Sequence, residues 1–264
     1  MKKNFIALLV VICVSSFAFI GDPFKVSNED SLISVKNERD EIFMLLAYSV
    51  VLDNWQTYDS TRGYNIGGVL VNDKGEVVNW ARNSTKVCFD KTAHGEVRLL
   101  QSYLNDEKTR KAKIKYVDGC TVYTTLEPCM MCSGMLIFLK TDRVVYGQTD
   151  PGYGLNIERL QSDIVVDQDT IPANSRAKSL DNSLCKSDCT KSLDSAYSKF
   201  KGKGIVDFLY KDEARRIYIQ AREKLLTYEV VNDENKKILK NAQNYLKKVE
   251  EKEVKDPCIK YVNR

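Results

Sequence analysis

The chain has 264 residues, of which 43% are hydrophobic and 29% are charged. This balance is typical of a globular protein with one sizeable core, and it excludes a collagen-like chain or a low-complexity array. The formal net charge is +4, and residues 201–264 hold 16 basic and 11 acidic side chains. A nucleic-acid-binding protein normally needs a basic face, and only this C-terminal part of the sequence offers one.

The first residues have the pattern of a targeting segment. Lys2 and Lys3 precede an apolar run, and Ser16-Phe17-Ala18 fits a small-x-small cleavage site. We predict that residues 1–18 are a signal peptide, that the protein is exported to a periplasm or secreted, and that it keeps no stable membrane partner after cleavage. The alternative is an uncleaved membrane anchor, but residues 5–20 span only 16 positions, short for a hydrocarbon core about 30 Å thick.

The next part of the chain alternates helical and strand patterns. Residues 22–36 are polar, and we expect them to be irregular. The following segments are expected in chain order: a helix over 37–55, strands over 65–73 and 76–82 joined by a turn at 73–75, a loop over 83–93, a helix over 94–104, a strand over 120–126, a helix over 129–139 and a strand over 143–147. This order predicts an α/β fold with three α/β/α layers, in which a sheet of about five strands has helices on both faces. We place this core at residues 37–150.

The composition changes after Asp150. Residues 151–203 are rich in Ser, Asp, Asn and Lys, which predicts an irregular insertion, with the sequence DIVVD at 163–167 as a short fifth strand. Residues 204–264 predict a helical C-terminal extension with two amphipathic helices that close the domain. The alternative role for these helices is to bind a partner.

The chemistry of the chain centres on Cys129 and Cys132, which are three residues apart behind Pro128. A redox pair would need an exposed position, whereas the neighbouring Met and Leu residues predict a buried helix. A structural zinc site would need four protein ligands, but the chain has one histidine, His94, and no second C-x-x-C motif. The third interpretation combines the cysteines with His94 and Glu96, because H-x-E followed by P-C-x-x-C is the signature of zinc deaminases.

Several sequences extend this match. IGGVLVNDKGEVV, ARN, TAHGE, YTTLEPCMMCSGM and RVVYG together resemble the cytidine/deoxycytidylate deaminase superfamily. The resemblance covers a little under half of the chain, from about residue 39 to residue 147. It is greatest to the branch of tRNA adenosine deaminases, guanine deaminases and small zinc cytosine deaminases.

The resemblance implies a role for each matching residue. His94, Cys129 and Cys132 are expected to hold Zn²⁺, with Glu96 as the catalytic proton shuttle. Zinc with three protein ligands keeps one position open for water and lowers its pKa. Pro128 is expected at the first helical position, and both cysteines in the first turn, where the helix dipole stabilises thiolates.

The substrate is less well defined by the sequence. Asn83 and Ala93 match positions of the substrate site, and Tyr153 is the strongest candidate for stacking on a base, ahead of Phe89 and Trp55. We expect a zinc-dependent hydrolytic deaminase of a nucleobase or nucleoside. The alternatives are a polynucleotide deaminase that holds its strand with the basic tail, and a binding module without catalysis. A homodimer is a further expected arrangement.

The other cysteines carry simpler expectations. Cys120 is expected to be a buried core residue. In an exported protein, four cysteines suffice for two disulfides whose connectivity the sequence leaves open: Cys88, Cys185, Cys189 and Cys258.

Overall fold

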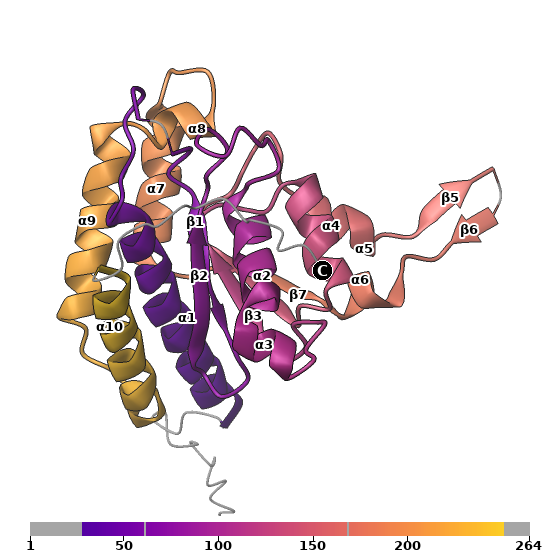
Figure 1. Cartoon of the computed structure of the whole chain (residues 1–264), viewed down its shortest axis with the longest axis horizontal. Coiled ribbons are helices and arrows are strands. Elements are labelled where there is room, and N and C mark those ends of the chain that lie inside the picture. The colour runs from indigo at the N-terminus through magenta and orange to yellow at the C-terminus, as the bar shows by residue number, and fades with distance from the viewer. Residues whose placement is uncertain (1–27, 61, 168, 251–264) are drawn as a thin grey trace, which may run out of the picture.

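The computed structural model describes residues 28–250 except residues 61 and 168. Its main sheet has five strands in the order β2-β1-β3-β4-β7 (Figure 1). Their bounds are β1 Gly67–Val71, β2 Val77–Arg82, β3 Thr121–Thr124, β4 Arg143–Tyr146 and β7 Asp181–Leu184. β1 runs antiparallel to β2 and β3, whereas β3, β4 and β7 are parallel.

Side chains alternate along the strands and so supply two separate cores. Val69 and Val71 belong to the core under α1 (Asn28–Leu52), whereas Leu70 between them belongs to the core under α2 (Gly95–Asn105) and α4 (Met130–Phe138). Helices therefore cover both faces of the sheet, as Figure 1 shows. The predicted α/β class and its three-layer arrangement are confirmed.

The remaining elements lie around this sandwich. A separate two-stranded sheet is formed by β5 and β6. The bounds are α3 Glu107–Lys111, α5 Asn156–Gln161, β5 Ile164–Val166, β6 Asp169–Ile171, α6 Ser175–Ser179, α7 Asp188–Lys199, α8 Ile205–Phe208, α9 Asp212–Leu226, the 3-10 helix η1 Asp233–Asn235 and α10 Lys236–Glu250.

Two expectations about the elements are wrong. The polar residues from Asn28 onward are helical, because they continue α1 beyond the sheet edge and part of this stretch meets the C-terminal helices. The fifth strand of the main sheet is β7, with the polar sequence DNSL, whereas residues 164–166 form β5 in the separate sheet. The polar residues of β7 adopt a strand because they pair in parallel with β4.

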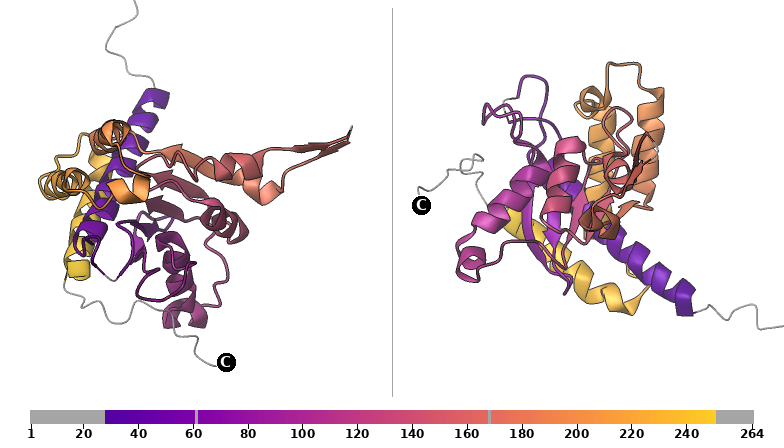
Figure 2. Two further views of the ribbon diagram at one scale, coloured as in Figure 1. Left: turned by 90° about the horizontal axis from the view of Figure 1, so that it is seen from above. Right: turned by 90° about the vertical axis from the view of Figure 1, so that its right-hand side faces the viewer.

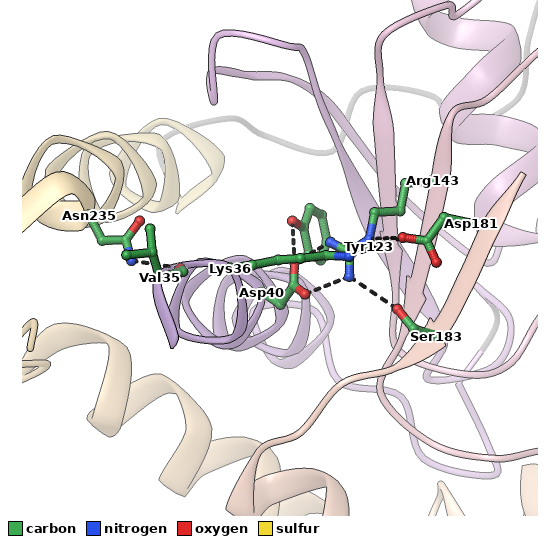
Figure 3. Close-up of polar contacts among 8 residues, drawn as sticks. All are labelled: Val35, Lys36, Asp40, Tyr123, Arg143, Asp181, Ser183 and Asn235. Carbon is green, nitrogen blue, oxygen red and sulfur yellow. Dashed lines mark hydrogen bonds and ion pairs between the residues drawn. The ribbon is translucent and has the colours of Figure 1, made fainter. Parts of the chain in front are cut away.

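An ion-pair network, buried at Asp40 and exposed at Asp181, ties β7 and α1 to the sheet (Figure 3). Arg143 on β4 donates two hydrogen bonds to the Asp40 carboxylate on α1, at 2.5 and 2.6 Å, and one from Nε to Asp181 on β7, at 2.8 Å. Tyr123 donates its hydroxyl to the same Asp40 carboxylate at 2.9 Å. Bidentate guanidinium–carboxylate geometry is strongly directional, so this network fixes the position of α1 over the strands.

The C-terminal extension packs on α1. The two predicted amphipathic helices are α9 and α10, and their buried faces join the core under α1. The buried Glu38 of α1 accepts hydrogen bonds from the backbone N–H of Asn232 at 3.1 Å and from the side chain of Asn235 at 2.7 Å. The apolar faces of α9 and α10 are thus used within the chain, as expected for helices that close the domain.

The predicted signal peptide at residues 1–18 lies outside the described residues, so it stays a prediction. The proposed domain boundaries also stay predictions. Within the part of the chain that the structure describes, no helix is long and apolar enough to cross a membrane.

Candidate metal centre

Two helix N-termini converge at the carboxyl end of β3. α2 has His94 as its N-cap residue, and α4 has Cys129 as its N-cap residue, both with extended backbone. Pro128 therefore precedes the N-cap, and its predicted place at the first helical position is wrong by two residues. The partial positive charges of both helix ends point toward the site, where they favour thiolates.

Three potential ligand atoms meet between these helix ends. His94 Nδ1 lies 3.6 Å from Cys129 Sγ and 3.6 Å from Cys132 Sγ, and the two sulfur atoms are 3.6 Å apart. Neighbouring ligand atoms in a tetrahedral zinc site, with Zn–S of about 2.3 Å and Zn–N of about 2.0 Å, lie about 3.5–3.8 Å apart. The donor set and its spacing therefore fit Zn²⁺ with one coordination position left open.

The two sulfur atoms differ in protonation when no metal is present. The hydrogen bond between the two sulfur atoms, with His94 adding to the effect, lowers the pKa of Cys129 to about 4. The same hydrogen bond, together with burial, raises the pKa of Cys132. A metal ligand must be deprotonated, so a bound cation has to displace the proton of Cys132, which couples metal affinity to pH.

Glu96 lies beside the ligands without belonging to their triangle. Its Oε2 is 3.5 Å from Cys132 Sγ, and its Oε1 accepts a hydrogen bond from the Thr124 hydroxyl at 3.2 Å. Burial raises the pKa of this carboxyl. A buried carboxyl that is fixed by Thr124 next to a metal centre is well placed to hold and transfer a proton.

Close packing of α2 on β1 requires a glycine at the position between His94 and Glu96. A Cβ atom at Gly95 would lie 2.9 Å from the Cα of Gly67 in β1, closer than real Cβ contacts allow. Gly95 thus lets the first turn of α2 lie directly on β1. The sequence HGE, together with the glycine pair of β1, was the available signal for this close approach.

Asn83 follows β2 and is almost completely buried. Its Oδ1 accepts hydrogen bonds from the backbone N–H groups of Tyr64 and Thr85 at 3.2 and 3.3 Å, and from the Thr85 hydroxyl at 3.0 Å. Because two backbone donors face this atom, it must be the carbonyl oxygen. Among the described residues, the amide NH₂ of Asn83 donates no hydrogen bond, whereas its oxygen accepts three.

The C-terminal extension braces the loop that holds Asn83. Asn65 donates a hydrogen bond to the carbonyl of Leu209 at 2.9 Å, and the Tyr210 hydroxyl donates to the carbonyl of Gly63 at 3.1 Å. Arg62 in the same loop donates a hydrogen bond to the backbone carbonyl of Asn83. These long-range contacts were invisible in the sequence, because 144 and 147 residues separate the partners.

The other two predicted substrate residues have different surroundings. Ala93 is buried, and its carbonyl accepts from the backbone N–H of Ser84 at 2.9 Å, so only its small side chain is left for contact. Tyr153 is exposed, in a loop after β4. Both stay predictions as substrate residues.

Sequence reasoning missed the role of Glu127. Its carboxylate is buried and accepts from the backbone N–H groups of Asp150 at 3.0 Å and Leu155 at 2.7 Å. Glu127 therefore ties the Tyr153 loop to the segment that carries Cys129. The signal was present in TLEPC, where a charged residue stands between a strand and a metal-ligand motif.

The remaining cysteines partly correct the sequence interpretation. Cys120 is buried, as expected. Cys88 is disulfide-bonded, whereas Cys185 and Cys189 are free buried thiols. The expectation of two disulfides among the four candidate cysteines is therefore wrong, because Cys185 and Cys189 are free and lie in the core under α1.

A structural class follows from this geometry: an α/β protein with a three-ligand zinc centre at the carboxyl end of a sheet strand. The family model of the cytidine and deoxycytidylate deaminase zinc-binding region matches residues 37–148. Residues 37–148 are thus similar to the zinc-binding region of cytidine and deoxycytidylate deaminases.

The sequence of this region is also similar to the sequences of known deaminases. The chain is 35% identical over 89 residues to the tRNA-specific adenosine deaminases of Aquifex aeolicus and Bacillus subtilis, a match to 34% of this chain and to 55% and 52% of theirs. It spans about half the length of these curated relatives. A guanine deaminase structure from Bacillus subtilis is 24% identical, with a TM-score of 0.37 over 51% of this chain and 83% of that one.

Proposed function

We propose that the protein is a zinc-dependent hydrolytic deaminase of a nucleobase or nucleoside. The observation that carries the proposal is the triangle of His94 Nδ1, Cys129 Sγ and Cys132 Sγ, with the Glu96 carboxylate at 3.5 Å from one of its sulfur atoms. A zinc ion bound there supplies a Lewis acid that lowers the pKa of water. The reaction replaces a ring amino group with oxygen, consumes one water and releases one ammonia.

The side chains then have separate tasks. Glu96 accepts one proton from the attacking water and delivers it to the ring nitrogen, and it then passes the second proton of that water to the amino group, which leaves as ammonia. Thr124 keeps the Glu96 carboxyl in place through its hydroxyl. The free NH₂ of Asn83 donates a hydrogen bond to an acceptor on the base, and burial of Glu96 and Asn83 excludes bulk water from both contacts.

Ammonia release is the direct test of this proposal. The zinc-loaded full chain is incubated with cytosine, guanine, adenine, their nucleosides and single-stranded RNA, with the Glu96→Gln variant as the blank. Release from at least one base or nucleoside is the expected result. Zinc binding without ammonia release from any substrate would overturn the proposal and favour a binding module.

A polynucleotide substrate is the second candidate. Two observations favour it: the curated relatives are named tRNA-specific adenosine deaminases, and Phe89 is 98% exposed in the loop between Asn83 and His94. Aromatic side chains at such a position stack on unpaired bases. A salt titration separates the candidates, because polynucleotide binding weakens steeply with salt and nucleoside binding does not.

Replacing Asn83 by Asp tests the base-reading role. Aspartate keeps the oxygen that accepts from Tyr64 and Thr85 but loses the NH₂ donor, whereas alanine would also release the loop. We expect kcat/KM to fall by about 5- to 150-fold, the effect of a lost hydrogen bond worth about 1–3 kcal/mol, with unchanged zinc content. Unaltered kcat/KM on the best substrate would remove Asn83 from the site.

We further propose that the protein is exported. The motif that supports this, with Lys2, Lys3 and the small residues near Ala18, lies outside the described residues. The mature N-terminus is expected at or near Phe19 in mass spectra of the native protein. An intact Met1 in a cytoplasmic fraction contradicts export. Export would also separate the protein from tRNA and so favours a small substrate.

A further inference from the structure

A short segment of the C-terminal extension lies against the loop that leads from Asn83 to His94. We call residues 207–211, at the junction of α8 and α9, the brace. Figure 1 and the right-hand view of Figure 2 place α8 at the same end of the molecule as the loops that follow α1 and β2. The brace lies beyond residues 37–148, so the similarity to deaminases assigns it no role.

Three successive residues enclose Asn83 on one side. Arg62 donates a hydrogen bond to the backbone carbonyl of Asn83, and the Tyr64 backbone N–H donates to Asn83 Oδ1 at 3.2 Å. Between them, Gly63 lies so close that a Cβ atom there would be 2.8 Å from the carbonyl oxygen of Asn83, nearer than real Cβ contacts allow. The position of Asn83 therefore follows the position of residues 62–64.

Two adjacent residues of the brace hold this segment. The Tyr210 hydroxyl donates a hydrogen bond to the carbonyl of Gly63 at 3.1 Å, and the carbonyl of Leu209 accepts one from the side chain of Asn65 at 2.9 Å. Tyr210 and Leu209 are both buried, so water competes little for these hydrogen bonds. The backbone on which Asn83 rests is thus fixed to the C-terminal extension.

Tyr210 also contacts the segment that follows Asn83. The Lys86 ammonium lies 5.1 Å from the centre of the Tyr210 ring, and the Tyr58 ring packs on the Tyr210 ring with 4.7 Å between their centres. Tyr58 in turn donates its hydroxyl to Asp207 at 3.0 Å. The Tyr210 side chain therefore meets the chain on both sides of Asn83.

We propose that Tyr210 is a positioning residue for the substrate base and acts through Asn83. Because the oxygen of Asn83 is held by Tyr64 and Thr85, the loop sets the direction of the Asn83 NH₂. The brace fixes this loop relative to the sheet that carries the metal centre, since α9 packs on α1 and α1 packs on β1. The proposal rests on the proposed deaminase function, because it needs a substrate that Asn83 contacts.

Steady-state kinetics of the zinc-loaded full chain test this role. Tyr210→Phe keeps the ring and removes only the hydroxyl that donates to Gly63. We expect KM for the best substrate to rise at least about threefold, within the range for one lost hydrogen bond. The value of kcat is expected to stay unchanged, because Glu96 is held by Thr124 and not by this loop. An unchanged KM, or a lower kcat alone, overturns the proposal.

Tyr228→Phe is the matched control. Tyr228 also belongs to the C-terminal extension, and its hydroxyl donates a hydrogen bond to Glu41 of α1 at 2.8 Å. The control therefore loses the same kind of contact between the extension and the rest of the chain, and its KM is expected to equal that of the wild type. A control that raises KM as much as Tyr210→Phe would mean a general loss of stability, which overturns the positioning role.

Combination with Asn83→Asp shows whether Tyr210 acts through Asn83. Asn83→Asp already removes the NH₂ that the brace positions, so adding Tyr210→Phe is expected to change kcat/KM by less than about twofold. If the two changes multiply in full, Tyr210 affects the reaction by another route and the proposal is wrong.

Hydrogen exchange separates a failure of this proposal from a failure of the deaminase function, because it needs no substrate. The backbone N–H groups of Tyr64 and Thr85, which donate to Asn83, are expected to exchange faster in Tyr210→Phe than in the wild type or in Tyr228→Phe. Equal exchange in the two variants overturns the brace. Faster exchange in Tyr210→Phe without ammonia release from any substrate overturns the deaminase function, and with it the role toward the base.

Discussion

Replacing Glu96 with glutamine is expected to lower kcat by about 10²- to 10⁴-fold, the contribution of general acid–base catalysis. Glutamine has nearly the same shape and keeps an oxygen for the Thr124 hydroxyl, which lies 3.2 Å from Glu96 Oε1. It cannot accept a proton, so the transfer from water to the ring and to ammonia is lost. Rates of ammonia release at saturating substrate measure the effect.

Zinc content and melting temperature complete this experiment. Both are expected to stay near the wild-type values, because Glu96 lies outside the triangle of ligand atoms. Glu107→Gln, in the exposed helix α3, is a control for the same chemical change away from the site. A Glu96→Gln variant that keeps its activity would show that another group moves the protons, and one that loses its zinc would make Glu96 a ligand.

Replacing Cys129 with alanine is expected to have the largest effect on the fold. The change removes one of three ligands and leaves two, which is too few for a stable zinc site in protein. Metal binding to such sites contributes to folding, so we expect both loss of zinc from the purified protein and a lower melting temperature. Metal analysis by mass spectrometry and thermal unfolding are the measurements.

Cys120 supplies the matched control for this prediction. It is also a free cysteine, but it is buried and lies before β3 in the core between the sheet and α2, whereas Cys129 is only partly buried. Cys120→Ala leaves a small cavity, which costs stability, yet the zinc content should remain unchanged. If Cys129→Ala keeps its zinc while Cys120→Ala loses it, the assignment of the metal centre is wrong.

Local patterns explain why the metal centre could be predicted so fully. His94, Glu96, Cys129 and Cys132 stand in two short motifs, and each motif begins a helix. Helix geometry brings residues three apart onto one face, so the C-x-x-C spacing sets the distance between the sulfur atoms before any tertiary contact forms. The β1–β2 hairpin was readable for the same reason, since its turn residue Gly75 has a φ of 71° and needs a glycine-type conformation.

Long-range contacts explain what was missed. β7 has a polar sequence and becomes a strand because β4 offers a parallel edge and Arg143 binds Asp181. Glu127, 23 residues before Asp150 and 28 before Leu155, fixes a loop that no local pattern describes. The sequence around Cys185 and Cys189 gives no sign that both are buried as free cysteines in the core under α1.

The sequence by itself determined the α/β order of elements through its periodicity, and its resemblance to a known family pointed to the three metal ligands and the adjacent carboxylate. Only the tertiary structure decided which strand completes the sheet and which atom of Asn83 accepts the hydrogen bonds of the neighbouring backbone. Such features depend on residues that are distant in the chain and become neighbours only when the core closes.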